Sequence, residues 1–228
     1  MFSNENTIDN RLIATIKKNN LKKLQKLVEN GAELNKTNRY GETLLHIAAR
    51  EGKEKIVAYL TDQNIDVNIK SSSNTTALHE ACSKGNYISA ASLIEHGAKI
   101  NEADDYGNLP IHNAALRGSY KTVKLLVENG ADINRRNELG ETALHEASWG
   151  GYTKIISYLL KHGADINAQN SRGETALYIV TERDKKKAVK LLLKKGADKN
   201  IATNTGETPQ DIAKKKNLKR VVRLLKIK

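Results

Sequence analysis

Short runs of apolar residues with helical spacing recur along the whole chain, separated by small and polar residues. In residues 136–168, one run reads TKIISYLLKH, and its apolar residues fall on one face of a helix: Ile155, Ile156, Leu159 and Leu160. A shorter run before it presents small and apolar residues: Ala143, Leu144 and Ala147. Thr142 stands where its hydroxyl could cap the first helix, and Gly150 and Gly151 stand where that helix would end. The pattern predicts a helix, a turn, a second helix and a loop.

This pattern has a period of 33 residues. Asparagine recurs at that step as Asn35, Asn68, Asn101, Asn134, Asn167 and Asn200. A second series contains only residues that tolerate a left-handed backbone: Asn19, Gly52, Gly85, Gly118, Gly151, Asp184 and Asn217. A third series runs Gly31, Asn64, Gly97, Gly130, Gly163 and Gly196. A fixed period of this length is typical of a protein in which each repeat packs on its neighbours.

The motifs GETLLHIAAREGKEKIV, GETALHEASWGGYTKII and LLKHGADIN resemble ankyrin repeats, whose TPLH motif appears here as TLLH, TALH, LPIH and TALY. The resemblance implies an all-α repeat solenoid in which each repeat is a β-hairpin tip followed by two antiparallel helices. It implies a single domain over residues 1–228, with repeats at 4–36 (N-terminal cap), 37–69, 70–102, 103–135, 136–168, 169–201 and 202–228 (C-terminal cap). By the same resemblance, tips and first helices line a concave face.

Composition indicates the cellular compartment in which the protein is expected. Cys82 is the only cysteine, so no intrachain disulfide can form, and this favours a reducing compartment. The first residues contain no apolar run of signal-peptide length, and no run approaches the length of a membrane span. We therefore expect a soluble, cytoplasmic, monomeric protein. The alternative is delivery into the cytosol or nucleus of a host cell, by a route that needs no Sec-type signal.

Repeating polar residues argue against catalysis. The four histidines His46, His79, His112 and His145 lie one repeat apart. Equivalent atoms of packed helices are about 10 Å apart, whereas zinc ligands must lie within about 2.1 Å of the ion. We expect each of these histidines to hydrogen-bond within its own repeat or to the next, and Cys82 to be a small core residue. No phosphate-binding loop or dinucleotide motif is present. A non-catalytic protein without cofactor or metal is expected.

Function should lie where the repeats differ. Trp149, the only tryptophan, shares its repeat position with Arg50, Ser83, Leu116 and Glu182. Because core positions do not alternate between charged and apolar residues, we predict that Trp149 faces solvent on the concave side. The alternative is that it folds back against Tyr152 or the first helix of the next repeat. Tryptophan, tyrosine and arginine are frequent at the energetic centres of interfaces. The predicted partner-binding residues are Tyr40, Arg50, Tyr106, Leu116, Arg117, Leu139 and Trp149.

Positive charge is concentrated near the C-terminus. Residues 168–228 contain 17 of the 38 basic residues and 6 of the 26 acidic ones. The predicted electrostatic patch comprises Lys185, Lys186, Lys187, Lys214, Lys215 and Lys216. A polar outer face on a capping repeat would explain this excess, and so would attraction to an acidic partner, a nucleic acid or an anionic membrane. Aromatic residues are missing from the last 50 residues, so any nucleic-acid binding there should be independent of sequence.

The sequence thus predicts a scaffold that binds a partner protein, of unknown identity, through its concave face. One alternative is an electrostatic binder of nucleic acid or anionic membrane that uses the basic C-terminal repeats. Another is a secreted bacterial or parasite effector that acts as a binding module for a host protein.

Overall fold

The computed structural model describes residues 8–63 and 65–226, and in these the chain forms fourteen helices. Each of the seven predicted repeats contributes two helices, here called its first and second helix. The chain divides into two compact units, Met1–Asp105 and Tyr106–Lys228, which are described separately. No helix in the described part of the chain is long and apolar enough to span a membrane.

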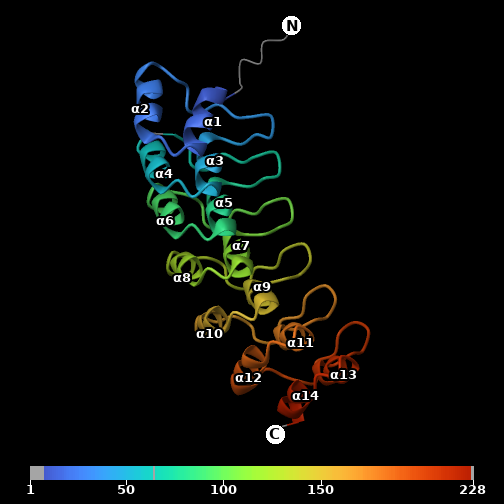
Figure 1. The fold of residues 1–228 in the computed structure, drawn as a ribbon. Helices are drawn as coiled ribbons and strands as arrows, with labels where there is room; N and C mark the ends of the chain where they lie inside the picture. Colours follow the sequence, from blue (N-terminus) through green and yellow to red (C-terminus); the bar gives the residue numbers. More distant parts are fainter. Residues whose placement is uncertain (1–7, 64, 227–228) are drawn as a thin grey trace. The chain divides into compact units, whose positions relative to one another are not determined.

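In the unit Met1–Asp105, the first helices pack against one another in one row, and the second helices lie in another row (Figure 1). The first helices are α1 (Asn10–Lys17), α3 (Leu44–Arg50) and α5 (Ala77–Lys84). The second helices are α2 (Leu21–Glu29), α4 (Glu54–Thr61) and α6 (Tyr87–Glu95). The turns before the first helices project away from the row of second helices.

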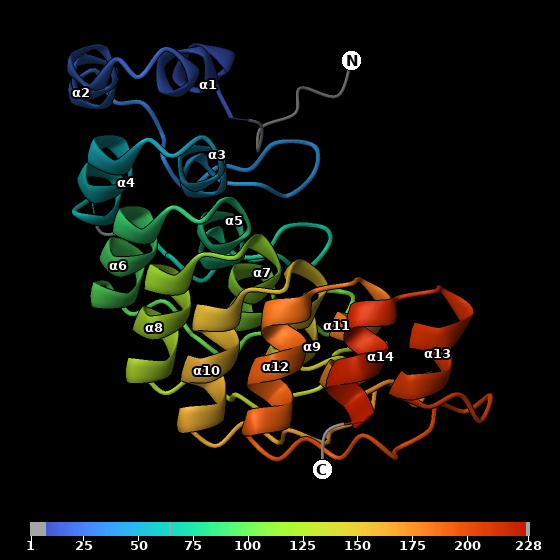
Figure 2. The same cartoon turned by 60° about the horizontal axis from the view of Figure 1, so that its bottom comes forward.

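The unit Tyr106–Lys228 repeats this arrangement. Its first helices are α7 (Pro110–Arg117), α9 (Ala143–Gly150), α11 (Ala176–Glu182) and α13 (Pro209–Lys215). Its second helices are α8 (Tyr120–Glu128), α10 (Thr153–Lys161), α12 (Lys186–Lys194) and α14 (Lys219–Lys226), which Figure 2 shows side by side. An all-α repeat fold is therefore confirmed.

One series of residues turns the chain from first to second helix in every repeat. All its members have a positive φ, as the sequence predicted: Asn19, Gly52, Gly85, Gly118, Gly151, Asp184 and Asn217. In the third predicted series, Gly31, Gly97, Gly130, Gly163 and Gly196 also have positive φ, and Asn64 lies outside the described residues. The helix ends were therefore readable from the sequence.

The predicted hairpin tips are tight turns with little strand character. An isolated antiparallel bridge joins Gln169 and Thr175. The turns are closed by backbone hydrogen bonds, such as Asn137 N to Glu141 O at 3.0 Å. Neighbouring turns within a unit are also joined, because Glu138 N donates to Tyr106 O at 2.9 Å. The turns are thus fixed in register with one another.

The periodic asparagines join successive repeats. Asn134 Nδ2 donates to Gly163 O at 2.9 Å, and Asp165 N donates to Asn134 Oδ1 at 3.0 Å. Asn68 makes the same pair of bonds, to Gly97 O at 3.0 Å and from Lys99 N at 2.8 Å. One amide side chain satisfies a donor and an acceptor of the next loop, which explains why asparagine recurs there.

Small residues let the first helices pack closely. Ala114, Ala115 and Ala147 are fully buried where α7 packs against α9. Cys82 is fully buried in α5, and burial raises the pKa of its thiol. Full burial confirms the prediction that Cys82 is a small core residue. A buried thiol with a raised pKa has little reactive thiolate.

Candidate functional site

The four repeat histidines have structural roles. His46 accepts a hydrogen bond from Thr43 N at Nδ1 (3.1 Å), and its Nε2 lies 2.9 Å from Thr75 O in the next repeat. His145 repeats this geometry with Thr142 N at 3.1 Å and Ala168 O at 3.0 Å. Because Nδ1 accepts, the proton must be on Nε2, which donates to the carbonyl. The predicted bonds within and between repeats are confirmed.

Burial lowers the pKa of His46 and of His145, which favours their neutral form. Thr142 is the N-cap residue of α9, as predicted, and forms a capping box with His145. Its backbone N donates to His145 Nδ1 at 3.1 Å, and its hydroxyl lies 2.9 Å from the same nitrogen. In residues 8–63 and 65–226, no group of three or more His, Cys, Asp or Glu side chains could hold a metal ion.

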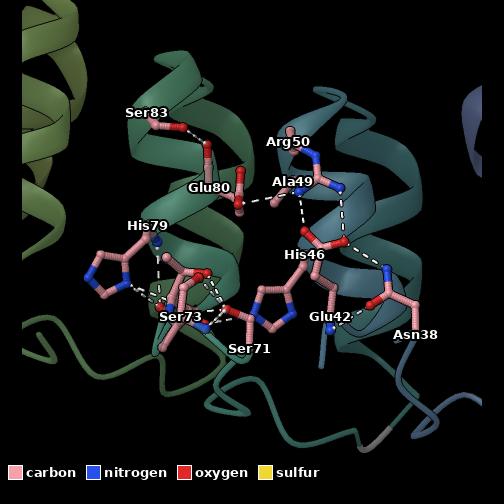
Figure 3. A network of polar contacts seen from close by, with 12 residues as sticks. Asn38, Glu42, His46, Ala49, Arg50, Ser71, Ser73, His79, Glu80 and Ser83 are labelled. Atoms are coloured by element: carbon pink, nitrogen blue, oxygen red, sulfur yellow. Dashed lines mark hydrogen bonds and ion pairs between the residues drawn. The ribbon is translucent and has the colours of Figure 1, made fainter. Parts of the chain in front are cut away.

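An ion-pair network connects two repeats of the unit Met1–Asp105. Figure 3 shows Arg50, at the end of α3, between Glu42 in the preceding turn and Glu80 on α5. The guanidinium pairs with Glu42 and lies 3.4 Å from Glu80. The hydrogen bond from Arg50 lowers the pKa of Glu42, whereas burial raises the pKa of Glu80. Arg50, a predicted partner-binding residue, is thus half-buried and already paired.

The same contact recurs in other repeats with different donors. In the repeat 136–168, Trp149 Nε1 donates to Glu141 Oε2 at 3.0 Å, and this pair has the register of Arg50 and Glu42. In the last repeat, Lys215 Nζ lies 2.7 Å from Glu207 Oε1 in the same register. In three repeats, therefore, a glutamate just before the first helix accepts a hydrogen bond from the side chain eight residues later.

Trp149 is half-buried and sits among internal partners. The guanidinium of Arg183, which follows α11, stacks on its ring at 4.0 Å from the centroid, and that of Arg172 lies 5.9 Å away. The prediction of a solvent-facing indole is therefore only partly right. Charged residues at the same repeat position signalled accessibility, but they could not show that the next repeat supplies a guanidinium. The ring of Tyr152 lies over Gly118 and Gly150.

Glu141, which binds Trp149, is only 3% exposed and is well supplied with donors. Besides the indole, Asn170 Nδ2 donates to it at 3.2 Å, and Arg172 lies 3.7 Å away. These contacts supply hydrogen-bond donors and a positive charge to a carboxylate that lies almost entirely out of solvent.

Glu146, one turn into α9, has the opposite environment. It is 9% exposed, and within the described residues no hydrogen bond or ion pair to its carboxylate is found. Burial, with a smaller contribution from the charge of Glu141, raises its pKa to about 7. Glu146 is therefore the least satisfied charge on the first helices of this unit, and it was not among the residues predicted from sequence.

Three large apolar side chains are exposed on the turns and first helices of the repeats 103–135 and 136–168. Tyr106 is 69%, Leu139 67% and Leu116 53% exposed. Arg117 is also exposed. Tyr40, in the other unit, is exposed too, and the guanidinium of Arg39 covers its ring at 4.7 Å. The structure brings Tyr106, Leu116 and Leu139 to one unit with Trp149, whereas Tyr40 and Arg50 lie in the other unit.

Most lysines of the predicted electrostatic patch have acidic neighbours. Ion pairs join Lys186 to Asp184 at 3.0 Å and Lys216 to Glu182 at 2.9 Å. Lys215 pairs with Glu207, as noted, and Lys214 lies 3.9 Å from Asp211. Lys187 is exposed, and the stem of Lys185 lies over Gly151. These local ion pairs neutralise part of the positive charge of the patch.

Comparison with known proteins agrees with this geometry. A family model for ankyrin repeats matches residues 12–104, 93–170 and 162–228. The chain belongs to the ankyrin-repeat family. Among solved structures, it is similar to the ankyrin repeat domain of Bcl-3, described as a unique member of the IkappaB protein family. That match has 26% sequence identity and a TM-score of 0.80, and it covers 97% of this chain and 100% of that chain.

No curated protein sequence matches the chain. Ankyrin-repeat domains bind protein partners, and the fold is known as a non-enzymatic interaction module. Membership of this family therefore indicates a chain that binds other proteins.

Proposed function

We propose that this ankyrin-repeat protein binds a partner protein through the turns and first helices of the unit Tyr106–Lys228. We call this surface the Leu139 face and define it by Tyr106, Leu116, Leu139 and Trp149. The observation that carries the proposal is the exposure of Tyr106, Leu116 and Leu139 on two successive repeats of a rigid scaffold. Large apolar side chains gathered on one surface mark interaction sites, and binding by a preordered surface loses little conformational entropy.

Trp149 supports the proposed face without being its most accessible member. Its indole is anchored by Glu141 at 3.0 Å and by the guanidinium of Arg183 at 4.0 Å from the ring centroid. An aromatic ring held in one orientation presents its remaining surface at low entropic cost. Arg117 flanks the face and adds a cationic side chain at its edge.

The test compares two double variants as baits in affinity purification from the native cell. Tyr106→Ala with Leu139→Ala removes two exposed side chains of the Leu139 face. The matched control, Tyr87→Ala with Ile88→Ala, removes two exposed apolar side chains from the second helix α6. With the recovered partner and purified proteins, the first variant should weaken binding by about 2 kcal/mol or more, and the control should change it by less than about 0.5 kcal/mol. The reverse ranking would place the interface elsewhere.

The basic end motivates a second candidate function, electrostatic binding of a nucleic acid or an anionic membrane. Its support is the excess of 17 basic over 6 acidic residues in 168–228. A variant with Lys185, Lys186, Lys215 and Lys216 changed to Glu tests it. Binding that relies on phosphates should fall steeply with salt and disappear in this variant, whereas a protein complex at the Leu139 face should weaken only modestly. If the variant binds normally at low salt, the basic end is only a solubilising cap.

A further inference from the structure

The recurring donor at the end of the first helix is missing in the repeat 103–135. In the other unit, Arg50 on α3 reaches Glu80 on α5 at 3.4 Å. Two repeats later the same register holds Leu116 on α7 and Glu146 on α9, and α7 packs against α9 as α3 packs against α5. Leucine has no hydrogen-bond donor in its side chain. Glu146 thus has an apolar residue at the position that supplies a guanidinium beside Glu80.

No other cation of the described residues replaces that guanidinium. Glu141 is the charged group whose field acts on Glu146, and it has the same sign. Two cationic groups of the next repeat have other partners: Arg172 lies 3.7 Å from Glu141, and Arg183 stacks on Trp149. Arg117 follows Leu116 directly, but adjacent residues of a helix do not face the same side.

An unpaired carboxylate in this position is unfavourable when it ionises. Glu146 is 9% exposed, so water solvates its charge poorly, and no protein group among the described residues pairs with it. A cation brought from outside would stabilise the ionised carboxylate. Leu116 is 53% exposed, so a ligand can reach this place by passing over it.

We propose that the partner at the Leu139 face inserts one lysine or arginine side chain across Leu116, so that its cationic group pairs with Glu146. The aliphatic stem of that side chain packs on Leu116, as the stems of lysine and arginine do on apolar surfaces. Apolar residues flanking it in the partner pack on Tyr106 and Leu139. The proposal rests on the proposed function and specifies its ligand: a protein segment with one basic anchor between apolar residues.

The experiment uses random peptides as the probe. A displayed library is selected against the full chain at about pH 8, where Glu146 is ionised for the most part. Enriched peptides should contain one Lys or Arg next to apolar residues. Their affinities are then measured by calorimetry for the wild type and for defined variants.

Four variants separate charge from shape. Glu146→Gln should weaken the selected peptides at least about tenfold, because a neutral amide of the same shape cannot pair with the cation. Leu116→Arg should weaken the peptides as much, because the new guanidinium would itself pair with Glu146, as Arg50 pairs with Glu80. Leu116→Met keeps the site apolar and should bind the peptides normally. The matched control Glu128→Gln, on the second helix α8, should change affinity less than about twofold.

Each outcome has a distinct meaning. If the peptides lose affinity with Tyr106→Ala and Leu139→Ala but bind Glu146→Gln like the wild type, the proposed function stands and the basic anchor is refuted. Enriched peptides without a basic residue would also refute it. If no peptide is enriched above an unrelated protein, the result counts against both the anchor and the Leu139 face.

Discussion

Ionisation of Glu146 should make the stability of this protein fall with rising pH. Burial raises the pKa of Glu146 from 4.5 to about 7, so the folded state holds this proton more tightly than the unfolded chain. Its contribution is therefore fully present below pH 4.5, declines as pH rises toward 7, and is lost above that value. Each pKa unit corresponds to about 1.4 kcal/mol, so the complete loss is about 3 kcal/mol.

Replacement of Glu146 by glutamine isolates this contribution. The amide has nearly the same shape and carries no charge, so its folded state has no ionisation to suppress. The free energy of unfolding of Glu146→Gln minus that of the wild type should rise by up to about 3 kcal/mol between about pH 4 and pH 8. Urea denaturation at a series of pH values measures this difference, in which the histidines and all other titrating groups cancel.

A control and a direct observation make the test decisive. Glu128→Gln, whose exposed carboxylate lies 3.6 Å from Lys124, should show a difference of less than about 0.5 kcal/mol at every pH. The carboxyl carbon of Glu146, followed by NMR, should titrate near pH 7. A normal titration below pH 5, or a Glu146→Gln variant that is destabilised at high pH, would mean that this carboxylate has an internal partner and that the reasoning is wrong.

Three further outcomes follow from individual contacts. Trp149→Phe should cost about 1–2 kcal/mol of stability, because it leaves the buried Glu141 without the indole donor, and a loss below about 0.3 kcal/mol in denaturation would show that this bond is unimportant. Gly118→Ala should cost about 2 kcal/mol or more, because φ is +79° and the new Cβ would lie 2.5 Å from the ring of Tyr152; an unchanged melting temperature would contradict this packing. Excess zinc or a chelator should leave the melting temperature within about 1–2 °C, because the repeat histidines bind backbone groups, and a clear drop with chelator would overturn their structural role.

Much of the backbone was determined by the sequence alone. Helix ends are set by local stereochemistry, so the series from Asn19 to Asn217 could be assigned a left-handed conformation from residue type and period. The histidine roles were also predictable, because a side chain that recurs once per repeat can only contact its own repeat or its neighbours. Asn134 and its equivalents were recognised as periodic, but their hydrogen bonds to the next loop became evident only in the structure.

The candidate site depended on tertiary structure. Trp149 looked accessible because its repeat position tolerates charge, yet Arg183, from the end of the next first helix, stacks on its ring at 4.0 Å. The lack of a partner for Glu146 could not be predicted from sequence either, because its neighbours come from another repeat. Whether a glutamate is paired depends on which side chain the neighbouring repeat places beside it. Arg50 on α3 reaches Glu80 on the next first helix, α5. The packing of α7 against α9 shows that Leu116 has the equivalent position beside Glu146. Local chain geometry repeats with the sequence period, whereas the balance of buried charge is decided by contacts between repeats.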